Sequence, residues 1–271
     1  MTATQARTTY RTIWISDTHL GNRNAQAQHL LEFLQQHHCD TLFLVGDIID
    51  LWKMSERGHW PKSHQAVVNQ ILTMADNGVR VVYVPGNHDP FFRKLVGHQL
   101  GHVEVHLEYV HEMLDGRRLL VVHGDCFDDE IAHSRFLFWL GDHAYETIVR
   151  LNRWLNQWRA RLGKPYWSLS GFLKVRSKKA QHFVQQFEQR AIAEARDRGL
   201  DGIVCGHIHQ AKLAEVEGVL YINDGDWLES CSSVVETQDG TLQLVHWATA
   251  HQQRVTLPPK VAKKPRPAFS S

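Results

Sequence analysis

The chain has 271 residues, which is enough for one large domain or for one domain that carries an insertion. Its 30 basic and 29 acidic residues leave a net charge of +1, so no overall field attracts nucleic acid and any basic patch must be local. Histidine is abundant, with 19 residues, and neutral imidazole is the commonest metal ligand in proteins.

The cysteines and the apolar runs indicate the cellular compartment in which we expect the protein. The four cysteines are far apart without a CxxC pair, which argues against a structural zinc site and against a disulfide framework. The N-terminal segment lacks an apolar signal core, and no run approaches the roughly 18 apolar residues that a membrane span requires. We therefore expect a cytoplasmic protein with reduced thiols that is soluble or peripheral.

The first 125 residues alternate between apolar runs of β type and amphipathic stretches. The apolar runs at residues 11–16, 41–46, 79–86 and 118–124 predict buried strands. The stretches at 25–38 and 62–77 predict helices. This alternation indicates the α/β class.

A different pattern follows residue 125. Residues 128–198 predict helices without a clear strand, and an apolar face recurs at helical spacing. Strand character returns at Gly202, with hairpins expected at Glu217-Gly218 and at 238–240. We predict a core of residues 10–125 and 200–248, a helical cap inserted at 126–199, and a disordered, basic, Pro-rich tail at 252–271.

Polar clusters follow the apolar runs directly. In chain order they are Asp17-Thr18-His19, Gly46-Asp47, Gly86-Asn87-His88-Asp89, His123-Gly124-Asp125 and Gly206-His207-Ile208-His209. One such cluster would indicate no more than a strand end and a turn, but five in order predict a metal site at the carboxyl ends of the strands. In the first and last clusters the ligand residues lie two apart, so an extended backbone would place them on one face. Mixed Asp, Asn and His ligands favour Mn, Fe or Zn over Ca or Mg.

These five clusters closely resemble the signature blocks of the calcineurin-like metallophosphoesterase family, over about residues 11 to 247. The resemblance implies a four-layer αββα sandwich that holds two divalent metals at the strand ends. By motif it assigns Asp17, His19 and His209 to one metal, Asn87, His123 and His207 to the other, and Asp47 to both. It implies that His88 is not a metal ligand.

The chemistry expected of this arrangement is phosphoester hydrolysis. Two cations roughly 3.5–4 Å apart can share a hydroxide, which attacks phosphorus while the cations clamp the phosphoryl group. His88 would stabilise or protonate the leaving oxygen, and Asp47 and His88 are the catalytic residues that we expect. Asp50 could hold His88 or a metal-bound histidine, or it could be a helix N-terminal carboxylate.

The predicted cap is strongly basic. No acidic residue lies between Glu146 and Glu188, whereas the stretch holds nine Lys and Arg residues interleaved with Trp154, Trp158 and other aromatic side chains. This pattern is compatible with a groove for an anionic amphiphile, a membrane-surface patch, a nucleic-acid surface, or a solvated basic face.

The size and position of this insert resemble those of the insert in the UDP-2,3-diacylglucosamine hydrolases of lipid A synthesis. Those enzymes split a pyrophosphate and release UMP and 2,3-diacylglucosamine 1-phosphate, usually with Mn. The resemblance implies an anionic, acylated nucleotide-sugar as substrate and a peripheral association with the inner membrane. It assigns substrate contacts to Asn87, His88, Asp129, Ser177 and Lys178. The chain departs from that family at His88, where the best-known members have Arg, and after His209, where it lacks their usual Arg-Pro.

Two other functions remain open from the sequence. A phosphodiesterase or nuclease of the same superfamily would use the same ligands on a different phosphodiester. A scaffold that has lost its metals is disfavoured because all seven ligand positions are chemically competent.

Overall fold

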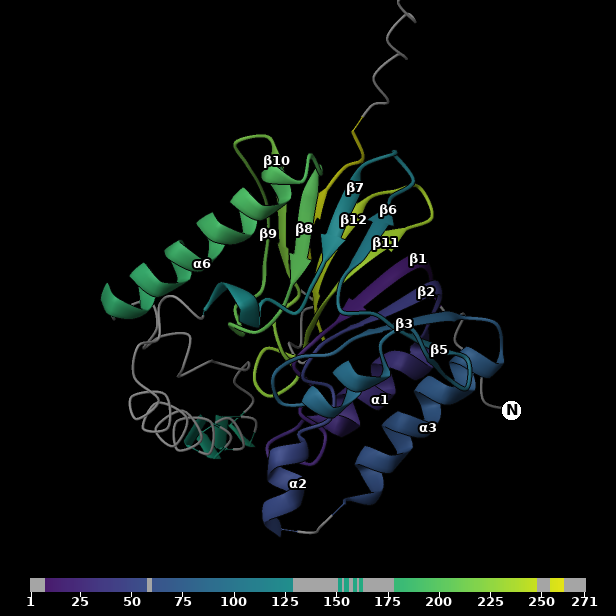
Figure 1. Ribbon diagram of the computed structural model, residues 1–271. Coiled ribbons are helices and arrows are strands. Elements are labelled where there is room, and N and C mark those ends of the chain that lie inside the picture. Colours follow the sequence, from purple (N-terminus) through teal and green to yellow (C-terminus); the bar gives the residue numbers. More distant parts are fainter. Residues whose placement is uncertain are drawn as a thin grey trace, which may run out of the picture.

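The computed structural model describes residues 8–57, 60–128, 178–247 and 254–260, together with 151–152, 154–155, 158–159 and 161–162. These residues form two β-sheets that lie face to face, with helices on their outer sides (Figure 1). Within these ranges, no helix has the length and apolar character needed to cross a membrane.

The larger sheet contains eight strands in the described residues, in the spatial order β13-β12-β11-β1-β2-β3-β5-β4. Their bounds are β1 Thr8–Ile15, β2 His37–Val45, β3 Arg80–Val84, β4 Gln99–Leu100, β5 Val103–Val105, β11 Ser232–Thr237, β12 Leu242–His246 and β13 Arg254–Leu257. Strands β1, β2 and β3 are parallel neighbours. Their carboxyl ends therefore lie at the same end of the sheet.

The smaller sheet contains five strands in the described residues, in the order β6-β7-β8-β10-β9. Their bounds are β6 Tyr109–Glu112, β7 Arg118–Val121, β8 Gly202–Cys205, β9 Lys212–Val216 and β10 Val219–Asn223. Strands β7, β8 and β10 are parallel, so their carboxyl ends also lie together.

The sheets pack because successive side chains of their central strands point to opposite faces. Ile13 of β1 belongs to the outer core, whereas Trp14 belongs to the core between the sheets. In the same way Leu119 of β7 faces the first sheet and Leu120 faces outward. Because both faces are buried, these strands appear in the sequence as continuous apolar runs.

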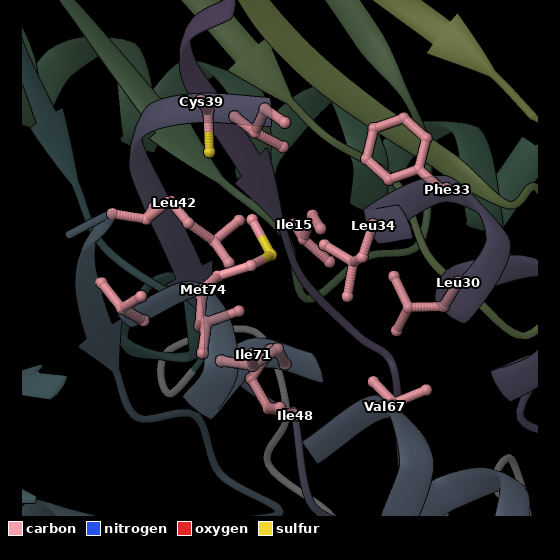
Figure 2. Close-up of a cluster of buried hydrophobic side chains, with 14 of the residues drawn as sticks. Ile15, Leu30, Phe33, Leu34, Cys39, Leu42, Ile48, Val67, Ile71 and Met74 are labelled. Atoms are coloured by element: carbon pink, nitrogen blue, oxygen red, sulfur yellow. The ribbon is translucent and has the colours of Figure 1, made fainter. Parts of the chain in front are cut away.

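Helices cover both outer faces and complete the four layers. Helices α1 (Ala27–Gln36) and α3 (Lys62–Asp76) cover the larger sheet, where Leu30 and Phe33 of α1 pack with Ile15, Leu42 and Ile71 (Figure 2). Shorter elements follow three strand ends: α2 (Leu51–Arg57) and the 3₁₀ turns η1 (Pro90–Leu95) and η2 (Asp125–Phe127). The predicted αββα sandwich is confirmed.

The smaller sheet is covered by α6 (Lys178–Asp197), which the sequence analysis placed in the cap. Phe187, Ala191 and Ala195 of α6 are buried against Ile203 and Tyr221. The helix thus forms the outer layer of the core, and the expected boundary of the insert at residue 199 differs from the structure. Residues 129–150 and 163–177 of the predicted cap lie outside the described residues.

The predicted strands and helices of the first 125 residues correspond to β1, β2, β3, β7, α1 and α3. Both hairpins form, and Glu217 and Gly218 have φ values of 49° and 81°, as a tight two-residue turn requires. Strands β4, β5 and β6 were not predicted, because they are short and β6 is partly exposed along its length.

Part of the segment that was expected to be a disordered tail is a strand in the structure. Residues 254–257 form β13, which pairs with β12 at the edge of the larger sheet. Leu257 packs against the core between the sheets, and two prolines follow it, which cannot donate to a further strand ladder. Residues 261–271 lie outside the described residues.

Candidate metal centre

The predicted ligands lie in five loops that follow β1, β2, β3, β7 and β8, at the carboxyl ends of the two sheets (Figure 1). Among the described residues, three groups of side chains offer ligand atoms within 4.8 Å of one another. The groups are Asp17, His19 and His209; His19, Asp47 and His88; and Asp47, His123 and His207. The packing of the two sheets therefore brings the loops of all five clusters to one place.

Five of these residues adopt an uncommon backbone conformation. Positive φ values occur at Asp17 (49°), His19 (46°), Asp47 (53°), His207 (67°) and His209 (51°). Left-handed backbone costs about 1–2 kcal/mol for a residue with a side chain, and such conformations are concentrated at functional sites. The expectation that the DTH and HIH residues share a face through extended backbone is wrong, because their backbone is left-handed. Asp17 and His19 still lie in one group, but His207 and His209 lie in different groups.

Glycine is required where two of these turns approach the carboxylates. A Cβ atom on Gly86 would overlap Oδ1 of Asp47, and a Cβ atom on Gly206 would overlap Ser16 and Oδ2 of Asp17. These two glycines let the main chain pass directly beside the carboxylates.

Asp47 lies at the middle of the site. Its Oδ1 accepts a hydrogen bond from the main-chain amide of His88 at 2.8 Å. Its Oδ2 lies 3.4 Å from Nε2 of His123 and 3.8 Å from Nε2 of His19. One carboxylate therefore faces histidines of two different groups, as a ligand shared by two cations must.

His123 and His19 are oriented through the nitrogen that faces away from Asp47. Nδ1 of His123 donates to the carbonyl of Val45 at 2.9 Å, so Nε2 is the nitrogen available to a metal, and it lies 3.2 Å from Oδ1 of Asn87. Nδ1 of His19 lies 3.3 Å from Oδ2 of Asp50. This arrangement is typical of imidazoles that bind metals.

One buried nitrogen of the site has surroundings that suit a bound cation. Nε2 of His19 is buried without a hydrogen-bond partner, and it lies 3.7 Å from Oδ1 of Asp17 and 3.8 Å from Oδ2 of Asp47. A buried polar atom of this kind needs a partner, and a cation between the imidazole and the two carboxylates would provide one.

Asp50 contacts two histidines. Its Oδ2 lies 3.3 Å from Nδ1 of His19, and its Oδ1 lies 3.4 Å from Nδ1 of His88. It also accepts the main-chain amide of Lys53 at 3.1 Å, at the start of α2. Both alternatives considered for Asp50 are therefore present in the structure. His88 packs at 4.4 Å against the half-exposed ring of Trp52.

The charges of the cluster are strongly coupled. Burial raises the pKa of Asp47, but His123 and His19 outweigh burial, so the pKa lies well below its usual value. Burial likewise opposes the charge on His123, but Asp47 raises the pKa of this histidine to about 10. The pKa of His19 is also raised, by Asp17 and Asp50, against the effect of burial. Without a metal, the carboxylates therefore hold protons on His19 and His123, and a cation must displace those protons when it binds.

Ser16 and the main chain of Trp227 hold Asp17, and Asp224 contacts Ser16; the sequence did not predict these roles. Ser16 Oγ lies 2.6 Å from Oδ2 of Asp17 and 2.5 Å from Oδ1 of Asp224, which is fully buried after β10. The main-chain amide of Trp227 donates to the carbonyl of Asp17 at 3.1 Å. The only sequence signal for these roles was that Ser16 precedes a ligand and that Asp224 follows an apolar run.

The structure describes three of the five residues that were expected to contact the substrate. Asn87 and His88 lie in the centre, next to His123 and Asp47 respectively. Lys178 is exposed at the start of α6. Asp129 and Ser177 lie outside the described residues.

A four-layer αββα sandwich with clustered aspartates and histidines at its strand ends defines the class: the protein is a metal-dependent phosphoester hydrolase. The chain belongs to the calcineurin-like phosphoesterase family, whose model matches residues 10–211.

Curated relatives of similar length refine the comparison. The chain is 25% identical over 254 residues to UDP-2,3-diacylglucosamine hydrolase of Salmonella paratyphi C, with 84% of this chain and 95% of that protein covered. It is 26% identical over 244 residues to the protein of the same name in Neisseria meningitidis serogroup B, with the same two coverages.

Solved structures show lower similarity. Vps29 of Entamoeba histolytica matches with a TM-score of 0.46 and 15% identity, covering 91% of this chain and 98% of that chain. A phosphoesterase of E. coli matches with a TM-score of 0.45 and 16% identity, covering 89% and 97%.

Proposed function

We propose that the protein is a pyrophosphate hydrolase of the UDP-2,3-diacylglucosamine diphosphatase type, which releases UMP and 2,3-diacylglucosamine 1-phosphate in lipid A synthesis. The observation that carries this proposal is that the curated relatives of that name match along 95% of their own length. Their similarity therefore includes the segment around the basic stretch as well as the hydrolase core.

The chain supplies seven ligands for two divalent cations in this proposal. Asp17, His19 and His209 hold one cation, Asn87, His123 and His207 hold the other, and Asp47 belongs to both. When bound, two such cations polarise the phosphoryl oxygens and lower the pKa of a water molecule that attacks phosphorus. Carboxylate, amide and imidazole donors suit Mn, Fe or Zn. Among these, we propose Mn, because the UDP-2,3-diacylglucosamine hydrolases that the chain resembles usually use it.

His88 acts at the leaving oxygen. It lies 4.0 Å from Oδ2 of Asp47, at the edge of the cluster, and its side chain is 16% exposed, the most accessible imidazole of its group. Asp50 lies at its other nitrogen, which can fix the ring and stabilise a proton on it. His88 can therefore donate a proton or a hydrogen bond to the oxygen that departs.

The apolar part of the substrate would use the cap. Trp154 and Trp158 lie 5.9 Å apart between ring centroids and are 58% and 52% exposed. Exposed tryptophans within a stretch that carries basic residues and no acidic ones suit an anionic amphiphile. The same surface would bring the enzyme to the inner membrane, where such a substrate resides.

A comparison of two substrates tests this proposal. Purified protein is loaded with Mn²⁺, and hydrolysis of UDP-2,3-diacylglucosamine is measured beside that of a small aryl phosphodiester. We expect kcat/KM to be much higher for the lipid substrate. Cleavage of only the aryl ester, or of DNA or RNA ends with a steep salt dependence, would replace this proposal with a phosphodiesterase or nuclease activity.

A further inference from the structure

A carboxylate outside the predicted ligand set contacts His207. Asp128 lies directly after η2, and its Oδ2 is in hydrogen-bond contact with Nε2 of His207. Both side chains are 10% exposed. None of the roles proposed above uses this contact.

We propose that Asp128 is a positioning residue of the metal centre, which accepts the Nε2 hydrogen of His207 so that Nδ1 faces the cation. The inference rests on the proposed role of His207 as a ligand. A neutral imidazole has one donor and one acceptor nitrogen, and a carboxylate can only accept. Nε2 must therefore carry the hydrogen, and Nδ1 keeps the lone pair that a metal requires.

The main chain of His207 is held as well. Its amide donates to Oδ2 of Asp17 at 2.8 Å, and its φ of 67° keeps the tight turn between the sheets. With the amide fixed at one end of the residue and Nε2 fixed at the other, rotation of the imidazole is restricted. Nδ1 is then the ring nitrogen of His207 that remains available to a cation.

The position of Asp128 is set by the core. Its amide donates to the carbonyl of Asp125 at 3.1 Å, and Arg190 of α6 donates to the carbonyl of Phe127 at 2.9 Å. The ring of Phe127 packs at 5.6 Å from that of Phe187. Helix α6 therefore supports the carboxylate from the outer layer of the sandwich.

Two other histidines of the centre, His19 and His123, show a related arrangement. His19 has Asp50 at 3.3 Å from Nδ1, and His123 has the carbonyl of Val45 at 2.9 Å from Nδ1. In each case an acceptor occupies the nitrogen that points away from Asp47. Asp128 would complete this pattern for His207, with the roles of its two nitrogens exchanged.

Metal binding without substrate tests the proposal. Metal-free protein is titrated with Mn²⁺, and free Mn²⁺ is measured by electron paramagnetic resonance, which gives the affinity of each equivalent. We expect Asp128→Ala and Asp128→Asn to weaken one equivalent about 10–100-fold and to leave the other unchanged. Asp201→Asn is the matched control, because this carboxylate contacts Arg118 at the opposite end of β8.

Two substitutions of His207 test which of its ring nitrogens binds the cation. An asparagine amide extends to about the position of Nδ1, and a glutamine amide to about that of Nε2. His207→Asn should therefore retain more of the affected equivalent than His207→Gln. The reverse order, or parent affinities for both equivalents in Asp128→Asn, would overturn the proposal.

Folding and function are separated in this design. Thermal unfolding of each metal-free variant checks the fold, and Asp128→Asn preserves shape if Asp128→Ala does not fold. A parent protein that binds two equivalents but does not cleave UDP-2,3-diacylglucosamine would contradict the proposed function alone.

Discussion

The main-chain amide of His207 donates a hydrogen bond to Oδ2 of Asp17 at 2.8 Å, across a separation of 190 residues. Asp17 follows β1 in the larger sheet, and His207 follows β8 in the smaller one. The bond therefore ties the two sheets together at the centre. A cation held by both loops would stabilise the packing of the sheets, because it binds only the folded protein.

Asp47→Asn should nearly abolish hydrolysis. The substitution removes the negative charge that faces both groups of histidines, while the amide retains the shape of the side chain. Turnover and metal content are measured together, and thermal unfolding of the metal-free protein checks the fold. Near-normal turnover with fewer than two metals bound would contradict the assignment of Asp47 to two cations.

His88→Ala should lower kcat by about 10²–10⁴-fold, the usual contribution of a general acid or base, and both metals should remain bound. The fall in kcat should be smaller for esters with a good leaving group, because their leaving oxygen needs little protonation. Because His88 also lies within ligand distance of His19 and Asp47, metal content is decisive. Loss of one equivalent would make His88 a ligand.

Replacing Trp154 and Trp158 together by alanine should affect the lipid substrate selectively. The lost apolar contact is worth a few kcal/mol at most, at about 25 cal/mol per Å² buried. KM for UDP-2,3-diacylglucosamine should therefore rise, while a small aryl phosphodiester is cleaved at the parent rate. Leu72→Ala, at an exposed residue of α3, is the control for surface truncation. Equal losses on both substrates would indicate a folding defect.

Metal affinity should rise with pH. Asp47 raises the pKa of His123 to about 10, and Asp17 and Asp50 raise that of His19 against the effect of burial, so cations compete with protons on these imidazoles. Calorimetry of Mn²⁺ binding in buffers of different ionisation enthalpy should show proton release at pH 7. Binding without proton release would show that the histidines are already neutral.

The same shift predicts how the metal-free protein responds to alkali. A raised pKa contributes stability that is complete below the unfolded value of about 6.5 and is lost as the pH rises towards 10. The melting temperature of the metal-free protein should therefore fall across this range. Protein loaded with Mn²⁺ should change less, because the cation takes the place of the protons.

The sequence alone predicted the α/β class, the central strands and a metal site at the ends of those strands. Strands with both faces buried are apolar over most of their length, so β1, β2, β3 and β7 were visible as nearly continuous runs. Ligand residues directly after those runs indicated strand ends, and α1 and α3 were visible from their amphipathic periodicity.

Only the tertiary structure decided how the ligands meet and what supports them. The left-handed turns at Asp17 and His207 are stabilised by contacts between the sheets, which no local pattern records. Asp224 and Asp128 contact Ser16 and His207 from distant parts of the chain. For the same reason α6 could not be separated from the insert by sequence, since its amphipathic face shows that it packs but not against which layer.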